Sequence, residues 1–175
     1  MTLVYFDSSA LVKLVLEEPG TPLAAELWDA CDGALSSRLA YPEVRAALAA
    51  SARNHELDAD ELLNAERAWE EFWGATRKVE LTSDVEQSAG RLASSHALRG
   101  ADAVHLASAL AIADDDLIVA VWDRRLHGGV LASGIRVAPA SLGVNITALP
   151  GPAPVGPHGP GSAGGAAAPP AEPAG

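Results

Sequence analysis

The chain opens with Leu3-Val4-Tyr5-Phe6-Asp7-Ser8-Ser9-Ala10-Leu11-Val12-Lys13-Leu14, and this stretch decides the fold. Its first four residues form a continuous apolar run, which is typical of a strand buried on both faces of a parallel sheet. An acid, Asp7, follows the run directly, and a helical pattern begins near Ser9. Since open α/β sheets bind ligands at the carboxyl ends of their strands, the stretch predicts a buried strand with an acid at the edge of the sheet where ligands bind.

A second apolar run repeats this arrangement late in the chain. Residues 117–121 are Leu-Ile-Val-Ala-Val, and Asp123 comes two residues after the run ends. Weaker strand candidates are residues 33–36, 78–81 and 135–138, while helical patterns cover about residues 9–16, 22–30, 42–53, 59–75, 85–95, 101–113 and 124–132. Strands that alternate with helices predict βαβ crossovers. We therefore expect an α/β fold of three layers, with a twisted, mainly parallel sheet flanked by helices.

The composition changes abruptly after Pro150. Between Gly151 and Gly175, 21 of 25 residues are Gly, Ala or Pro, which leaves almost no side chain that could pack in a core. Such a composition is typical of disordered segments. We therefore expect one folded domain over residues 1–148 and a disordered Gly/Ala/Pro-rich tail over residues 149–175.

Targeting and redox features of the sequence favour a cytoplasmic protein. The N-terminus has no basic segment before its apolar residues, and no stretch approaches the roughly 20 apolar residues that a membrane span needs. Cys31, the single cysteine, has no partner for a disulfide within the chain, and no Cys/His cluster has zinc spacing. We expect a cytoplasmic location and no membrane partner.

Four acids fall where strands end or helices begin. Asp7 and Asp123 follow apolar runs, and Glu43 and Asp102 lie in the first turns of predicted helices. Each acid taken alone is explained more simply as a residue that stabilises a helix N-terminus. Taken together, like charges at one edge raise each other's pKa and destabilise the fold, so the set favours a bound cation.

An all-oxygen cluster selects hard ions, which makes Mg²⁺ the expected cofactor and Mn²⁺ the alternative. Such an ion suits hydrolysis of phosphodiester bonds by metal-activated water. The net charge of −11 at pH 7 is unfavourable for phosphate contacts, which need Lys or Arg. Because the ion would neutralise the acidic pocket, this charge does not exclude a nuclease.

Four segments resemble the PIN domains of VapC toxins in order and spacing. They are the opening stretch quoted above, Ala40-Tyr41-Pro42-Glu43-Val44, Arg99-Gly100-Ala101-Asp102-Ala103-Val104-His105-Leu106-Ala107-Ser108-Ala109 and Val121-Trp122-Asp123-Arg124-Arg125-Leu126. The resemblance covers nearly all of residues 3–142. It departs at Trp122, because the family often has Thr or another small polar residue before the last acid.

The resemblance implies a PIN-like nuclease domain over residues 1–148 with Mg²⁺-dependent endoribonuclease activity. Carried over by position, the catalytic and metal-binding residues are Asp7, Glu43, Asp102 and Asp123. The resemblance further implies the toxin component of a type II toxin–antitoxin pair, with an RNA substrate, a cognate antitoxin that blocks the site, and a toxin homodimer. The alternative left open is a non-catalytic PIN-fold module that binds RNA or a partner.

Residues beside the four acids have two interpretations each. Ser8 is a candidate for the metal shell, whereas Ser9 is expected to cap the following helix. His105 lies one helical turn after Asp102 and could act as a general base, although a half-buried histidine that donates a hydrogen bond is the simpler interpretation. Trp122 is expected to pack rather than to stack on a base.

Five basic residues are candidates for contacts with RNA phosphates. Because the chain has more acidic than basic residues, ordinary ion pairing with Asp or Glu explains each of them equally well. They are Lys13, Arg38, Arg99, Arg124 and Arg125.

Two further alternatives are weaker. Bulky apolar side chains on the helix predicted over residues 59–75 favour core packing, or a hairpin with the helix over residues 42–53, over a dimer face. A phosphatase or receiver domain with Asp7 as nucleophile is disfavoured, because Ser9 occupies the position of the second phosphatase aspartate and no lysine follows Lys78.

Overall fold

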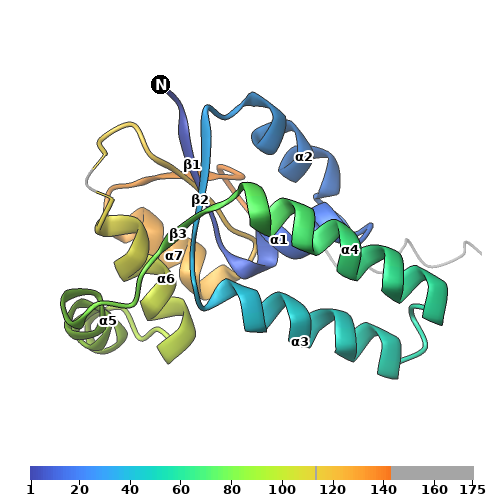
Figure 1. Ribbon diagram of the computed structural model, residues 1–175. Helices are drawn as coiled ribbons and strands as arrows, with labels where there is room; N and C mark the ends of the chain where they lie inside the picture. Colours follow the sequence, from blue (N-terminus) through green and yellow to red (C-terminus); the bar gives the residue numbers. More distant parts are fainter. Residues whose placement is uncertain (113, 143–175) are drawn as a thin grey trace, which may run out of the picture. The chain divides into compact units, whose positions relative to one another are not determined.

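The computed structural model describes residues 1–112 and 114–142 of the 175-residue chain (Figure 1). The described residues form β1 (Leu3–Phe6), α1 (Ser8–Val15), α2 (Thr21–Ala30), β2 (Gly33–Ser37), α3 (Ala40–Arg53), α4 (Ala59–Ala75), β3 (Arg77–Val79), α5 (Ser83–Ser95), α6 (Gly100–Leu110), β4 (Ile118–Ala120), α7 (Arg124–Ala132) and β5 (Arg136–Ala138). The predicted α/β class is confirmed. The expected domain end at residue 148 and the expected tail lie outside the described residues. None of the described helices is long and apolar enough to cross a membrane.

The strands form one sheet in the order β3-β2-β1-β4-β5, and every strand pair among the described residues is parallel. The central strand is β1, in which Val4 pairs with Ala34 of β2 on one side and with Ile118 of β4 on the other. The chain goes from β1 outward to β2 and β3, then crosses back to β4 and β5. The direction of winding therefore reverses between β1 and β4, and such a reversal opens a crevice at the carboxyl ends of the two strands.

Alternate side chains of β1 belong to two separate cores. Leu3 and Tyr5 pack with α5, α6 and α7, whereas Val4 and Phe6 pack with the first four helices. Successive residues of a strand point to opposite faces of the sheet, so a fully apolar strand can serve both layers. Figure 1 shows α1 to α4 on one side of the sheet and α5 to α7 on the other.

Element boundaries differ from the predicted ones by a few residues. α6 ends at Leu110 rather than near residue 113, and β4 is shorter than the apolar run over residues 117–121. α3 begins at Ala40, two residues before Pro42. Pro42 is tolerated there because N–H groups in the first turn of a helix have no intrahelical acceptor.

The bulky apolar side chains of α4 contribute to the core, as the sequence favoured. α3 and α4 form an antiparallel hairpin, and Trp69 of α4 is fully buried. The centroid of the Trp69 ring lies 5.9 Å from that of Tyr41 and 5.3 Å from that of Trp73. Leu63, on the same helix, is 54% exposed.

Replacing Trp69 by Ala should lower the free energy of unfolding by about 3–5 kcal/mol, because the change leaves a cavity beneath the α3–α4 hairpin. Urea denaturation followed by circular dichroism measures this loss. Leu63→Ala is the matched control, and since Leu63 is 54% exposed its effect should stay within about 0.5 kcal/mol. Equal losses in the two variants would contradict the packing role of Trp69.

Candidate active site

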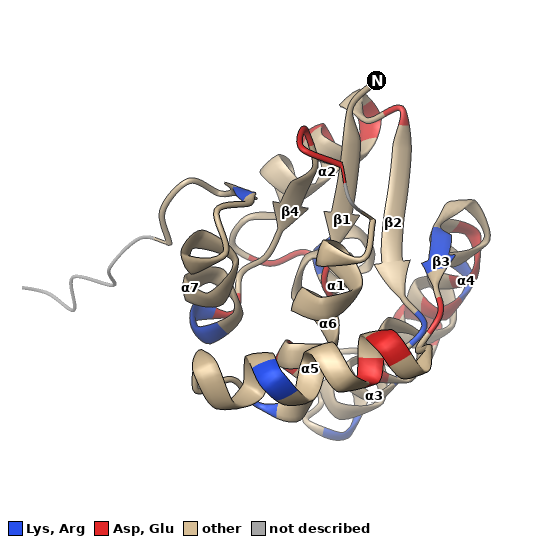
Figure 2. Ribbon diagram, turned by 90° about the vertical axis from the view of Figure 1, so that its left-hand side faces the viewer, with Lys and Arg blue, Asp and Glu red and all other residues tan. Residues whose placement is uncertain are grey.

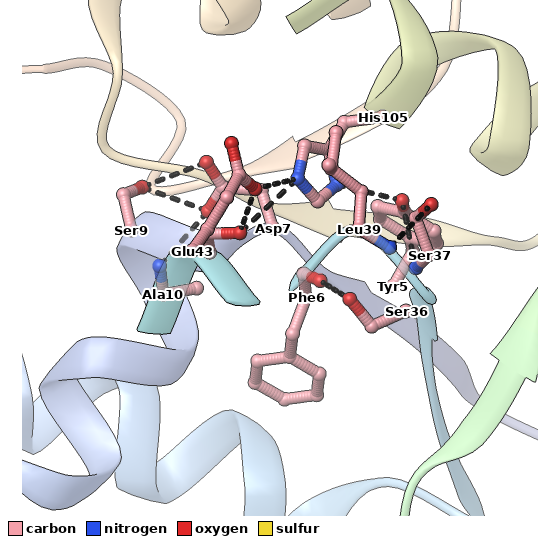
Figure 3. A network of polar contacts seen from close by, with 11 residues as sticks. Tyr5, Phe6, Asp7, Ser9, Ala10, Ser36, Ser37, Leu39, Glu43 and His105 are labelled. Atoms are coloured by element: carbon pink, nitrogen blue, oxygen red, sulfur yellow. Dashed lines mark hydrogen bonds and ion pairs between the residues drawn. The ribbon is translucent and has the colours of Figure 1, made fainter. Parts of the chain in front are cut away.

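Asp7 lies where β1 ends and α1 begins, and it caps that helix. Its carboxylate accepts hydrogen bonds from the Ala10 backbone N–H at 2.8 Å and from the Ser9 hydroxyl at 2.7 Å (Figure 3). Burial raises the pKa of Asp7 above its usual range, and the charge of His105 and the hydrogen bond from Ser9 only partly oppose this rise. Asp7 is therefore a desolvated carboxylate at the edge of the sheet that the sequence predicted.

Glu43 lies in the first turn of α3 and is held by two side chains. His105 Nε2 lies 2.8 Å from Glu43 Oε2, and the Ser8 hydroxyl donates to the same oxygen. Burial raises the pKa of Glu43, but the hydrogen bonds from His105 and Ser8 outweigh burial, so this pKa lies below its usual range. Glu43 is thus kept ionised, and Figure 3 shows it hydrogen-bonded to His105, with Asp7 and its partners Ser9 and Ala10 nearby. Ser8 therefore lies beside Glu43, and its place in a metal shell stays a prediction.

His105 is more deeply buried than the sequence suggested, with 3% of its surface exposed. Its Nδ1 lies 2.8 Å from the Tyr5 hydroxyl, which accepts a hydrogen bond from the Ser37 backbone N–H at 3.1 Å. One arrangement of protons satisfies the whole chain of contacts: Tyr5 donates to Nδ1, and Nε2–H donates to Glu43. Since both ring nitrogens are engaged, the geometry fits the hydrogen-bonding interpretation of His105 better than the general-base interpretation.

The hydrogen-bonding role of Tyr5 is not among the predictions from the sequence, and the prediction that Ser9 caps the helix is wrong. In the sequence Tyr5 is one residue of an apolar run, and the signal for its role is that a buried tyrosine hydroxyl generally needs a polar partner. Ser9 does not cap the helix, because Asp7 is the N-cap. The Ser9 hydroxyl instead donates to Asp7 and accepts a hydrogen bond from the Trp122 backbone N–H at 2.8 Å. It therefore ties the end of β1 to the segment that follows β4.

Asp102 and Asp123 form the second half of the site, in the first turn of α6 and at the N-cap of α7. Asp123 Oδ1 accepts hydrogen bonds from the backbone N–H groups of Arg125 at 2.8 Å and Leu126 at 3.0 Å. Asp102 Oδ2 is buried and has no hydrogen-bond partner among the described residues. Burial, and then the negative charge of Asp123, raise the pKa of Asp102, while the backbone and charge of Arg99 oppose the rise.

The four acids lie at the same edge of the sheet, around His105. Glu43 is hydrogen-bonded to the imidazole, a positive charge on His105 would lower the pKa values of Asp7 and Asp102, and the negative charge of Asp123 raises the pKa of Asp102. Within the part of the chain that the structure describes, no three His, Cys, Asp or Glu side chains are arranged to hold a metal ion as they stand. The donor chemistry nevertheless fits a hard divalent cation, because Asp102 Oδ2 is a buried oxygen that no described residue hydrogen-bonds, and a second carboxylate, that of Asp123, lies beside it.

The five basic candidates fall into two groups. Lys13 is buried and lies 2.7 Å from Glu18, and Arg38 lies 2.6 Å from Glu80, so ordinary ion pairing accounts for both. The other three are exposed and form no ion pair with a carboxylate in residues 1–112 and 114–142; they are Arg99, Arg124 and Arg125.

Trp122 packs, as the sequence favoured. Gly20 has a φ of 103°, and a Cβ added there would lie 2.5 Å from Trp122 Nε1, so only glycine fits beneath the ring. Lys13 Nζ lies 5.5 Å from the centroid of the Trp122 ring. The residue before Asp123 is therefore fixed against the connection between α1 and α2.

Known proteins resemble this chain over most of its length. The PIN domain family matches residues 4–126. The chain is 71% identical over 142 residues to Ribonuclease VapC45 of Mycobacterium tuberculosis strain CDC 1551 / Oshkosh and to Ribonuclease VapC49 of strain ATCC 25618 / H37Rv, with 81% of this chain and 99% of each relative covered.

Solved structures share the fold at low sequence identity. M. tuberculosis VapC20, described as a Sarcin-Ricin loop cleaving toxin, has a TM-score of 0.56 at 18% identity, over 75% of this chain and 95% of that one. A toxin–antitoxin complex from Klebsiella pneumoniae has a TM-score of 0.51 at 18% identity, over 69% of this chain and 86% of that one. The three-layer α/β fold is therefore the PIN-like fold that the sequence predicted.

Replacing Tyr5 by Phe should lower the free energy of unfolding by about 1–3 kcal/mol, because the Ser37 N–H and His105 Nδ1 both lose a buried partner. Tyr41→Phe is the matched control: its hydroxyl bonds Glu70 at the surface, so the change should stay within about 0.5 kcal/mol. Urea denaturation of both variants gives the comparison. A Tyr5→Phe protein as stable as the control would show that the buried network contributes nothing to folding.

Replacing Asp102 by Asn should stabilise the metal-free protein near neutral pH. The folded state raises the pKa of Asp102, so the ionised carboxylate opposes folding above that pKa, and the penalty disappears as the pH falls through it. The increase in the free energy of unfolding that Asn brings should therefore be largest near neutral pH and smaller in mildly acidic buffer. Urea unfolding in the presence of EDTA measures it.

Asp84→Asn is the control for that prediction. Asp84 is an exposed acid in the first turn of α5, where its negative charge stabilises the helix. Replacing it by Asn should therefore lower the free energy of unfolding by about 0.3–1 kcal/mol near neutral pH. If Asp102→Asn destabilised the protein like Asp84→Asn, Asp102 would be an ordinary helix-terminal acid.

Proposed function

We propose, from the premise that the chain belongs to the PIN-domain family and within it to the VapC toxins, that it is a Mg²⁺-dependent endoribonuclease and the toxin of a toxin–antitoxin pair. The observation that carries the proposal is that Asp102 Oδ2 lies beside Asp123 with no hydrogen-bond partner in the described part of the chain, at the edge that also holds Asp7 and Glu43. The relatives at 71% identity carry the name ribonuclease, which supports RNA as the substrate.

The four acids would contribute to cation binding in different ways. Asp7, Asp102 and Asp123 would supply oxygens to Mg²⁺, and Glu43 would supply a further negative charge that Ser8 and the His105 imidazole hold in place. When bound, Mg²⁺ lowers the pKa of water, polarises the scissile phosphodiester and stabilises the leaving oxygen. The chain itself contributes the rigid placement of these carboxylates at the reversal point of the sheet, where bound RNA would meet them.

Two protein partners follow from the family. A cognate antitoxin would bind the toxin and block the acidic edge, and the Klebsiella pneumoniae structure of the same fold is itself described as a toxin–antitoxin complex. We further propose a toxin homodimer and a cytoplasmic location, since RNA and the antitoxin would both be met there.

Replacing Asp7 by Asn should lower the rate of RNA cleavage at least about a hundredfold, because the amide removes a buried negative charge from the cation site. The rate is measured on total cellular RNA with Mg²⁺, and EDTA should abolish cleavage by the wild type. Asp29→Asn makes the same chemical change at an exposed position of α2 and should retain the wild-type rate. A wild-type protein that binds RNA without cutting it in Mg²⁺ would contradict the proposal and support the non-catalytic module.

A further inference from the structure

We propose that an open hollow between α7 and the α5–α6 connection holds the RNA strand beside the cut site, with Arg124 and Arg125 binding its phosphates. The inference rests on the proposed ribonuclease function and adds where the substrate lies. The hollow measures about 670 Å³, and its lining residues are His96, Ala97, Arg124, Arg125, Gly128, Gly129 and Ala132.

The hollow is basic although the chain is strongly acidic. The sequence contains 23 Asp and Glu against 12 Lys and Arg, yet no acid is among the residues that line this hollow in the described part of the chain. Figure 2 faces the side of the molecule with α5, α6 and α7, where the start of α7 is blue. Arg124 directly follows Asp123, so the hollow begins beside the acidic site.

The two arginines are available to a ligand. Both are exposed, and neither forms an ion pair with a carboxylate among the described residues, whereas Lys13 and Arg38 are tied to Glu18 and Glu80. An exposed guanidinium without an internal partner can bind phosphate oxygens through two parallel hydrogen bonds.

The position of the arginines is unfavourable for the stability of the helix. Arg124 and Arg125 occupy the first turn of α7, where the unpaired N–H groups carry partial positive charge and cations are disfavoured. Asp123 caps this end, but two further cations bring no benefit to the helix. Helix stability therefore does not explain why two arginines occupy these positions, whereas binding of an anionic ligand does.

Two consecutive glycines shape the floor of the hollow. A Cβ on Gly129 would lie 3.2 Å from a side-chain carbon of Leu98, so packing accounts for that glycine. A Cβ on Gly128 would meet nothing within 4 Å, so packing within the described residues does not account for it. Glycine inside a helix is destabilising, and at position 128 its effect is to leave the floor of the hollow open.

RNA fits this hollow better than an acidic peptide does. Phosphates repeat along the strand, so a strand whose scissile phosphate lies at Asp102 and Asp123 must place neighbouring phosphates next to those acids. Arg124 is one residue away from Asp123, and the hollow continues along α7 from that point. The chemistry that recognises the ligand is therefore a pair of guanidinium groups on successive phosphates.

The test is the double variant Arg124→Gln/Arg125→Gln in the full chain, with a labelled single-stranded RNA that the wild type cuts. KM should rise about tenfold while kcat stays within about twofold, because the arginines bind flanking phosphates and not the reacting one. The slope of log KM against log salt concentration should fall by about 1.4, since each phosphate contact on single-stranded RNA contributes about 0.7.

The matched control is Arg53→Gln/Arg67→Gln, which makes the same change of charge at exposed positions of α3 and α4 and should retain the wild-type KM. A double variant of the hollow with wild-type KM and salt dependence overturns this inference, and wild-type cleavage in the same assay leaves the proposed function standing. A wild type that does not cut RNA at all refutes both. Weakened binding of a partner protein with unchanged KM for RNA also overturns the inference, in favour of a peptide site.

A second variant tests the hollow without changing charge. Gly128→Leu fills the floor and replaces a poor helix former by a good one, so the thermal midpoint should not fall. KM for the same RNA should rise at least about threefold with kcat unchanged, a change of about 0.65 kcal/mol in binding. A wild-type KM in this variant would show that RNA does not occupy the hollow.

Discussion

The double burial of β1 is the constraint on which the rest of the structure depends. The strand is paired on both edges and packed on both faces, so its end is a rigid point on the sheet, and Asp7 lies at that end. The one polar side chain among its four residues, Tyr5, bonds the end of β2 through Ser37 and α6 through His105. Because His105 in turn binds Glu43, the position of the central strand also fixes an acid that lies 38 residues after Tyr5 in the sequence.

The acids at this edge are satisfied in different ways. Asp123 bonds backbone N–H groups of its helix, and Glu43 bonds side chains that lower its pKa. Asp7 and Asp102 instead have raised pKa values, because burial removes water that no protein donor fully replaces. A fold selected only for stability would neutralise or expose two such carboxylates. Both carboxylates lie at the reversal point of the sheet, where ligands bind. Residues that lower the stability of a fold in this way are typical of functional sites.

Patterns along the chain predicted most of the fold but fewer of the contacts. Apolar runs identified β1 and β4, and alternation with helices predicted the parallel sheet, because both signals are local. The end of α6 and the start of α3 were less predictable, since packing shifts helix ends by a residue or two. Ser9 and Tyr5 could not be placed, because their partners Trp122 and His105 lie about a hundred residues away and only the folded register brings them together.

The charge distribution reconciles the acidity of the protein with the RNA substrate that we propose. Lys13 and Arg38 are matched by neighbouring acids, so these two pairs add little net positive charge to the surface. Arg124 and Arg125 have no such partner among the described residues, and they adjoin Asp123, where a cation would also reduce the negative potential. One edge could then attract RNA while the remaining surface repels it. Repulsion by the remaining surface would confine the RNA strand to the one edge where it can be cut. The net charge of −11 at pH 7 would then restrict where RNA binds rather than prevent binding.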